Sequence, residues 1–304
     1  GVLISLVAVA VVLRLARWEE LSVAFQSVQP INVVIAVILN LASLLLRTAA
    51  WRILLGGEVP FFQTFFILNI GYLLNNVFPL RAGEVGRVLL MGKASQKGPF
   101  FVLSTIVIER ALDITLAGGL LAASLPFALS LDVDWAYPVA LTTLLVVLSL
   151  LCALYLMARF RDRLGSWIQK LGERSSFLQK WVIPQIDSLF NGLQVLTNFR
   201  KFISCVFFLV LCWFVYLVIF YVLLLQVSPG VPFWWSAFGQ SIVALGIAIP
   251  SAPGALGVYE ASTVGAMTIL GVSASSALAF ALIMHFITFV ITSILGFWGL
   301  AREG

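Results

Sequence analysis

Long apolar runs with almost no charge are the feature that most limits what this chain can fold into. Examples are Ile31–Leu46, Ala136–Met157 and Phe202–Leu225. Each has roughly the ~20 residues that a helix needs to cross ~30 Å of hydrocarbon. Open sheets are excluded in lipid because unpaired backbone groups are costly there, and the two-residue alternation of an outer-membrane barrel is missing. The sequence therefore predicts an all-α, polytopic bundle of transmembrane helices.

The composition agrees with this prediction. Hydrophobic residues make up 62% and charged residues 10% of the 304 positions, which is far more apolar than a water-soluble domain can bury. The apolar stretch before Arg14 lacks a basic start and a small-residue cleavage pattern, so we interpret it as a membrane helix and not as a removable signal. We expect a multi-pass protein of the cell (inner or plasma) membrane.

Basic residues indicate the orientation. The segment 159–201 carries eight Lys and Arg residues against three acidic ones, and such an excess marks the cytoplasmic side. We expect a cytoplasmic amphipathic linker that rests on anionic lipid headgroups, with no role for nucleic acid. It divides a single membrane domain, 1–304, into halves of about 1–158 and 202–304. The expected apolar anchors of the linker are Trp167, Leu171, Phe177 and Trp181.

Two apolar segments, Phe61–Pro79 and Phe233–Pro250, are interrupted by polar residues and glycine. Both lead into the same breaker pattern, P-x-x-x-G-x-x-G, which we interpret as a weak internal repeat. The predicted structural breaks are Pro79, Gly83, Gly86, Pro250, Pro253, Gly254 and Gly257. Because proline removes a donor and glycine relaxes the backbone, each pattern should break its helix at membrane depth.

The positive-inside rule makes the first broken segment enter from the cytoplasm and the second from outside. We therefore expect two re-entrant helical hairpins in an inverted repeat. Paired broken helices of this kind point to a substrate site near the bilayer midplane, where helix N-termini offer N–H groups to an anion. The alternative is that both patterns are ordinary kinks or loop ends.

Charged residues also occur inside the predicted helix of about Phe100–Leu129. Ionisable groups in apolar segments are costly, so they are functional candidates by default. Glu109 and Asp113 share one helix face, and Arg110 can reach Asp113. For Arg110 and Asp113 we favour an ion pair that fixes the orientation of the helices.

Arginines of the first half are the natural partners of these carboxylates. Arg47 precedes the first break, and Arg81 and Arg87 flank Glu84 within it. Since arginine binds carboxylate or phosphate with a planar fork of donors, such a cluster can lock a bundle or receive a lipid phosphate. For Arg81 and Arg87 we favour contact with a ligand or headgroup.

In the second half, Gln240 and Ser251 are placed where broken backbone would face a cavity, and Tyr259 and Glu260 follow the break. Glu260 is interpreted as the partner of a first-half arginine or as a protonatable site that couples transport to a proton. His285 is interpreted as a packing residue. The candidate substrate-binding residues are Arg47, Asn75, Asn76, Arg81, Glu84, Arg87, Glu109, Arg110, Asp113, Gln240, Ser251, Tyr259 and Glu260.

The sequence contains few residues that could form a catalytic or metal-binding site. The chain has three cysteines without close pairing and a single histidine, so we expect no metal and no cofactor. It also lacks a nucleotide-phosphate loop, so transport would draw on an ion gradient, a partner or the lipid gradient. A membrane-embedded transferase or hydrolase acting on a lipid phosphate, with Glu84 or Glu109 as base, is an alternative, and a non-transporting scaffold for a glycosyltransferase is another.

Four motifs, in order, carry a family resemblance: R-T-A-A-W-R-I-L-L, N-N-V-F-P-L-R-A-G-E-V-G-R, I-E-R-A-L-D and P-S-A-P-G-A-L-G-V-Y-E. The chain resembles the transmembrane region of lysylphosphatidylglycerol synthases, also called flippase-like membrane proteins, over essentially its whole length. The matching positions are Arg47, Trp51, Arg52, Asn75, Asn76, Pro79, Arg81, Gly83, Glu84, Arg87, Glu109, Arg110, Asp113, Pro250, Pro253, Gly254, Gly257 and Glu260.

The resemblance implies a lipid-flipping module and not an enzyme. Its best-known relatives carry a cytoplasmic aminoacyl-transferase domain and move aminoacylated phosphatidylglycerol to the outer leaflet. This sequence shows no such domain, so the expected substrate is a phospholipid or a lipid-linked anion such as a polyprenyl phosphate or glycolipid. A second copy of the chain, or a glycosyltransferase or synthase, is the expected protein partner.

Overall fold

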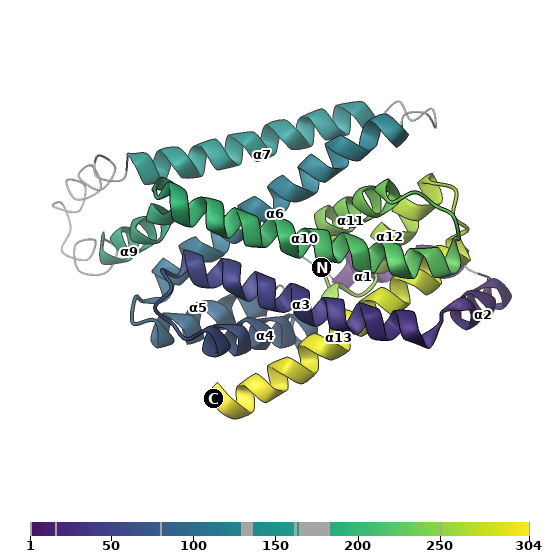
Figure 1. The fold of residues 1–304 in the computed structure, drawn as a ribbon, viewed down its shortest axis with the longest axis horizontal. Helices are drawn as coiled ribbons and strands as arrows, with labels where there is room; N and C mark the ends of the chain where they lie inside the picture. Colours follow the sequence, from purple (N-terminus) through teal and green to yellow (C-terminus); the bar gives the residue numbers. More distant parts are fainter. Residues whose placement is uncertain are drawn as a thin grey trace.

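The computed structural model describes residues 2–15, 17–79, 81–128, 136–160, 163, 183–249 and 251–303. All regular elements in these residues are helices, which confirms the predicted all-α class (Figure 1). In chain order they are α1 (Val2–Leu15), α2 (Trp18–Ser27), α3 (Pro30–Leu54), α4 (Phe61–Val77), α5 (Ala82–Ala94), α6 (Pro99–Ala128), α7 (Ala136–Arg159), α9 (Ile183–Leu193), the 3-10 helix η3 (Gln194–Thr197), α10 (Phe199–Val227), α11 (Trp234–Ile247), the 3-10 helix η4 (Pro253–Ala255), α12 (Val258–Ile269) and α13 (Ala274–Glu303).

Within the described residues, three helices are long and apolar enough to cross a membrane: α3, α10 and α13. The predicted runs Ile31–Leu46 and Phe202–Leu225 lie inside α3 and α10, and Ala136–Met157 lies inside α7. The predicted anchors Trp167, Leu171, Phe177 and Trp181 lie outside the described residues.

Helices α3 and α10 pack along one another in opposite directions (Figure 1). Gln29, just before α3, donates its backbone N–H to the side chain of Gln226 near the end of α10, 3.4 Å away. Midway, the Cys212 thiol donates to the carbonyl of Ser43 at 3.3 Å. The beginning of α3 therefore lies beside the end of α10. We call the end of the molecule where α3 finishes and α10 begins the basic end, because Arg52, Lys97 and Lys201 gather there.

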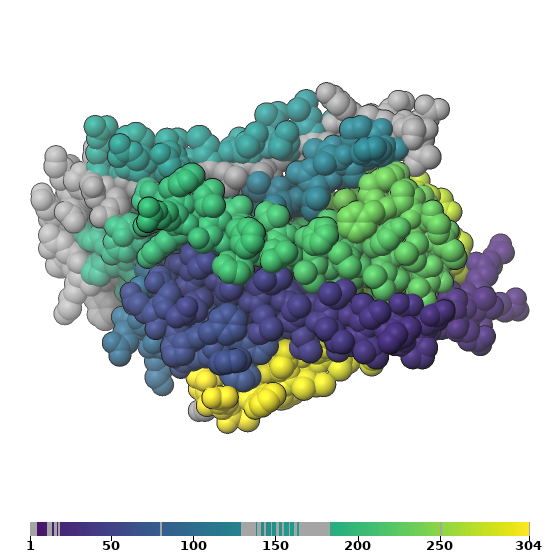
Figure 2. Space-filling model, in the orientation of Figure 1, coloured from purple at the N-terminus to yellow at the C-terminus, as the bar shows by residue number. Residues whose placement is uncertain are grey.

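The outer faces of this helix pair are apolar. Side chains such as Ile38 on α3 and Phe207 and Phe214 on α10 are more than half exposed. Figure 2 shows the two helices as adjoining bands on one face of the molecule. Exposed apolar surface on this scale is typical of a protein that lies in lipid or binds another apolar surface.

Helices α4 and α5 form a hairpin, which we call the first hairpin, and Phe78, Pro79 and Arg81 lie at its tip. Both of its outer ends lie at the basic end: Lys97, after α5, donates to the carbonyl of Leu55, after α3, at 3.2 Å. The two helices touch through glycines. A Cβ on Gly83 would lie 1.8 Å from the carbonyl oxygen of Gly71, so neither helix could come this close with a side chain at that position.

Helices α11 and α12 form a second hairpin, whose tip comprises 248–257 and includes η4. It starts at the end of the molecule opposite to the basic end, where Trp234 stacks on Phe127 near the end of α6 with ring centroids 5.9 Å apart. Its backbone adopts positive φ values at Gly254, Ala255 and Gly257 (62°, 57° and 83°). Helix α11 therefore ends at Ile247 and α12 begins at Val258, and the predicted break Pro250 lies outside the described residues.

The two tips meet. The guanidinium of Arg81, at the first tip, donates to the carbonyl of Ile247 at the end of α11. A Cβ on Gly254 would lie 3.8 Å from the Cα of Asn76. The first hairpin thus extends from the basic end and the second from the opposite end. Their tips touch between these two ends of the molecule. Helix α1 covers the second tip, where the Ser5 hydroxyl accepts from the N–H of Ala252 at 3.0 Å.

Candidate functional site

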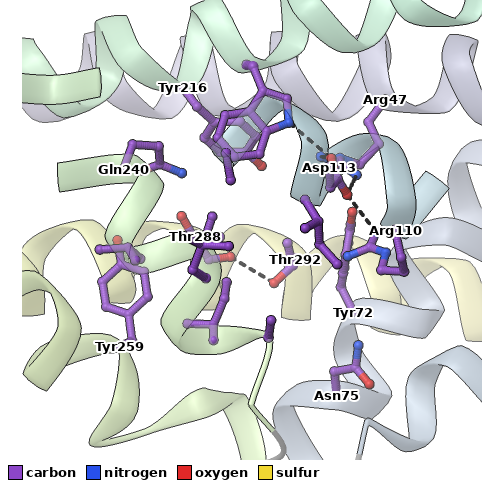
Figure 3. Close-up of a pocket in the computed structure, with 18 of the residues that line it drawn as sticks. Arg47, Tyr72, Asn75, Arg110, Asp113, Tyr216, Gln240, Tyr259, Thr288 and Thr292 are labelled. Atoms are coloured by element: carbon purple, nitrogen blue, oxygen red, sulfur yellow. Dashed lines mark hydrogen bonds and ion pairs between the residues drawn. The ribbon is translucent and has the colours of Figure 1, made fainter. Parts of the chain in front are cut away.

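A cavity of about 360 Å³ lies between the two tips, walled by α3, α6, α10 and α13 (Figure 3). This volume falls in the range of small-ligand pockets. Eight of the predicted site residues line it: Arg47, Asn75, Asn76, Arg81, Arg110, Asp113, Gln240 and Tyr259. Two hairpin tips and four longer helices thus contribute to one space.

The charged side of the cavity is built around two carboxylates of α6. Arg47 on α3 binds Asp113 with two hydrogen bonds, 2.9 Å and 3.0 Å long, and also reaches Glu109 at 2.8 Å. Arg110 pairs with Glu109 at 2.7 Å and with Asp113 at 3.3 Å. Helical spacing explains this grouping, because residues three and four apart share one helix face.

Glu109 also connects this cluster to the first hairpin. Its second oxygen accepts from Arg87 on α5 at 2.6 Å, and Arg87 also pairs with Glu84 at 3.3 Å. The Arg87 guanidinium lies over the ring of Trp51, 4.0 Å from its centroid. Arg87 and Glu109 are each only 1% exposed, so this part of the network is a buried structural connection and does not line the cavity.

Arg81 differs from the other three arginines of this region. In the described part of the chain it forms no ion pair, and its hydrogen-bond partner there is a backbone carbonyl, that of Ile247. Its backbone is left-handed, with φ 56° and ψ 42°, a conformation that costs a non-glycine residue roughly 1–2 kcal/mol. Four arginines therefore stand against three carboxylates, and the surplus positive charge lies at the cavity.

Asparagines hold the first tip in place. The side-chain oxygen of Asn75 accepts from the N–H of Gly83 at 2.8 Å, which satisfies a free donor at the start of α5. The amide of Asn76 donates to the hydroxyls of Thr292 and Ser293 on α13 at 3.1 Å and 3.0 Å. The tip is thus bonded to α5 and to α13.

The remaining walls are aromatic and aliphatic. Tyr72, Tyr216 and Tyr259 line the cavity, and the indole N–H of Trp213 donates to Asp113 at 3.0 Å. Figure 3 shows Tyr216 and Tyr259 on the side away from Arg110. One side of the cavity is therefore charged and the other is apolar with hydroxyl groups, which suits a headgroup attached to a chain.

The other predicted residues lie around the cavity without lining it. Glu84, Arg87 and Glu109 belong to the buried network, and Ser251 is buried at the second tip. Glu260 contacts His285 on α13 at 2.5 Å and not an arginine of the first half. Sequence reasoning missed the lining residues Tyr72, Trp213, Tyr216, Thr288 and Thr292.

A comparison with family models identifies the Lysylphosphatidylglycerol synthase TM region over residues 1–296. Comparisons with curated proteins and with solved structures gave no match. The match covers both hairpins and about three quarters of α13. The chain belongs to the family of the lysylphosphatidylglycerol synthase transmembrane region, a membrane protein family associated with lipids.

Proposed function

We propose that this protein is a transporter that moves an anionic lipid, a phospholipid or a lipid-linked phosphate or glycolipid, between the two leaflets. The observation that carries the proposal is Arg81: a cation without an ion-pair partner in the described residues, at a cavity between two broken hairpins. The partly buried arginine fork of Arg81 is suited to phosphate. A charge in this position that lacks an ion-pair partner is unfavourable until an anion arrives.

The hairpins supply the second part of the proposal. We interpret them as re-entrant segments of an inverted pair in the cell membrane, because they extend from opposite ends of the molecule and touch at their tips. Broken backbone at membrane depth is tolerated only where protein or a wet cavity surrounds it. Alternating separation of the tips from the surrounding helices would open the cavity toward one side at a time.

Leaflet exchange in proteoliposomes tests this function. Purified protein is reconstituted with a fluorescent phosphatidylglycerol, and the fraction of label accessible to a membrane-impermeant quencher is followed in time. We expect exchange well above that of protein-free vesicles, with the lipid recovered chemically unchanged by mass spectrometry. Exchange at the protein-free rate would overturn the proposal, and a modified lipid would favour a transferase or hydrolase instead.

Arg81→Asn is the matching variant, since asparagine tolerates the left-handed backbone but carries no charge. We expect it to slow exchange of the anionic lipid at least about tenfold, which corresponds to ~1.4 kcal/mol. Arg17→Gln is the control, because the Arg17 side chain is 82% exposed and does not line the cavity. Wild-type exchange in Arg81→Asn would remove Arg81 from the mechanism.

A further inference from the structure

His285 is the single histidine of the chain, and both of its ring nitrogens lie next to oxygen atoms. Nε2 is 2.8 Å from the carbonyl oxygen of Gly254, and Nδ1 is 2.5 Å from Oε1 of Glu260. A carbonyl oxygen only accepts, so Nε2 must carry a hydrogen. The contact between Nδ1 and Oε1 then needs a second proton, either on the ring or on the carboxyl group. The pair therefore holds one proton that it can exchange.

The pair is enclosed and has no other charged partner in the described residues. Its side chains are 12% and 9% exposed, and the second oxygen of Glu260 accepts from the N–H of Gly257 at 2.6 Å. If the shared proton leaves, one uncompensated negative charge remains in a low-dielectric setting, which is unfavourable. Occupancy by the proton must therefore be coupled to the conformation of this region.

The neighbours of the pair leave few other groups that could titrate. Tyr259 on α12 contacts the His285 ring with centroids 4.5 Å apart and the ring planes tilted by 32°, and Tyr216 on α10 lines the same cavity as Tyr259. Helix α1 contributes Ser5 at this tip and α4 contributes Asn76, and neither side chain titrates. The ring of Phe289 on α13 lies 6.5 Å away.

The same contacts hold the second tip in its broken conformation. His285 binds the carbonyl of Gly254 and Glu260 binds the N–H of Gly257, and between them Ala255 has a left-handed φ of 57°. A non-glycine residue keeps such a conformation only where its surroundings impose it. Gly254 also packs on Asn76 at the first tip. Loss of the shared proton would set the lone pairs of His285 Nδ1 and Glu260 Oε1 against each other. Their repulsion would push the His285 ring away from Glu260 and so weaken its contact with Gly254 at the second tip.

We propose that His285 and Glu260 form a proton-binding site whose loading and release drive movement of the hairpin tips at the lipid cavity. The ligand is a proton. The pair takes it up from one side of the membrane and releases it to the other, and no covalent bond forms or breaks apart from the N–H or O–H bond to this proton. This inference rests on the proposed lipid transport and supplies its energy source. Tyr259 connects the two sites, since it lines the cavity and its ring contacts that of His285.

Nitrogen-15 NMR of histidine-labelled protein, purified with a tag that contains no histidine, reports the site independently of transport. Because the chain has one histidine, a single pair of ring signals results. We expect the doubly protonated ring at neutral pH in the wild type and a neutral ring in Glu260→Gln, whose amide oxygen can still accept from Gly257. A neutral wild-type ring, with no Glu260-dependent carboxylic acid band in the infrared spectrum, would overturn the site.

Proteoliposomes with an imposed pH gradient test the coupling. We expect the gradient to accelerate exchange of the anionic lipid in the wild type and in the control Phe286→Leu, whose side chain is 69% exposed. Glu260→Gln and His285→Gln should lose this dependence on the gradient. Equal wild-type rates with and without the gradient would overturn the coupling and leave lipid transport standing, whereas absence of any exchange would overturn the lipid function and the coupling with it.

Discussion

The guanidinium of Arg47 and the carboxylate of Asp113 form two parallel hydrogen bonds, 2.9 Å and 3.0 Å long, between α3 and α6. The side chains are 8% and 14% exposed. The sequence suggested Arg110 as the partner of Asp113, and Arg110 does approach it at 3.3 Å. The closer partner, however, comes from another helix. The pair therefore ties two helices together at the edge of the cavity.

Removal of one partner should destabilise the protein. We predict that Asp113→Asn lowers the free energy of unfolding by about 3–5 kcal/mol, because it removes one of the two carboxylates that compensate the buried guanidinium of Arg47 and leaves Glu109 shared among three arginines. Thermal unfolding in detergent measures the change. Glu58→Gln is the control: it also removes a carboxylate from an ion pair, with Lys97, but Glu58 is 65% exposed, so we expect ~1 kcal/mol or less. Equal shifts for both variants would contradict the buried role.

The close contact within the first hairpin gives a second prediction. Gly83→Ala places a Cβ 1.8 Å from the carbonyl oxygen of Gly71, so the helices must separate and we expect a loss of about 1–3 kcal/mol. Gly119→Ala on α6 is the matched control, since nothing lies within 4 Å of the added carbon. Because alanine favours a helix interior, that variant should be stabilised by about 0.5–1 kcal/mol. Opposite signs in thermal unfolding would verify the contact.

The geometry of the Arg81 side chain, and not only its charge, should matter. We predict that Arg81→Lys keeps part of the exchange of anionic lipid and lies between the wild type and Arg81→Asn. Lysine retains the positive charge but lacks the planar fork that binds two phosphate oxygens at once. Exchange rates for phosphatidylglycerol, with phosphatidylcholine as the reference lipid, measure the effect. A rate for Arg81→Lys equal to that of Arg81→Asn would show that charge alone contributes nothing.

Reduction of the cavity volume should slow exchange without unfolding the protein. Ala244 lines the cavity, and Ala244→Leu extends a larger side chain into it. We expect exchange of the anionic lipid to fall at least about tenfold, or ~1.4 kcal/mol, with little change in the unfolding temperature. Gly265→Ala on α12, where nothing lies within 4 Å of the new carbon, should leave exchange unchanged. Normal exchange in Ala244→Leu would place the lipid path elsewhere.

The helical class could be predicted from apolar runs because lipid permits few alternatives to a helix. Glycine is free to adopt the positive φ values found at Gly254 and Gly257, whereas Gly83 and Gly86, also predicted as breaks, lie inside the helix α5. The prediction was wrong at these two glycines because the first hairpin turns before α5, where Arg81 adopts the left-handed conformation. The inverted repeat, the division into halves and the substrate-binding role of the lining residues stay predictions. The arginines and acidic residues near the first tip were found because a charge in an apolar segment is conspicuous.

The aromatic lining residues Tyr72, Trp213 and Tyr216 could not be predicted from the sequence, because they carry no charge that would distinguish them. Trp213 and Tyr216 lie in a continuous apolar run, where nothing local distinguishes a side chain that faces a cavity from one that faces lipid. Only the packing of α10 against α3 and α6 decides it. For the same reason the sequence suggests an arginine, or a protonatable role without a partner, for Glu260 and does not indicate His285. The contact with His285 spans 25 residues and depends on how α13 lies along α12.

The contact between Arg81 and the carbonyl of Ile247 determines how much negative charge a ligand needs in order to bind Arg81. A backbone carbonyl bears only a partial negative charge, so a full anion can displace it from the guanidinium, while an uncharged headgroup offers no better acceptor. Displacement also removes the one hydrogen bond that Arg81 makes across the tips. Under the proposed function, binding of the anionic headgroup and loss of the contact between Arg81 and Ile247 at the tips are therefore a single event. Neutral lipid does not cause this event, even though it is abundant in the membrane.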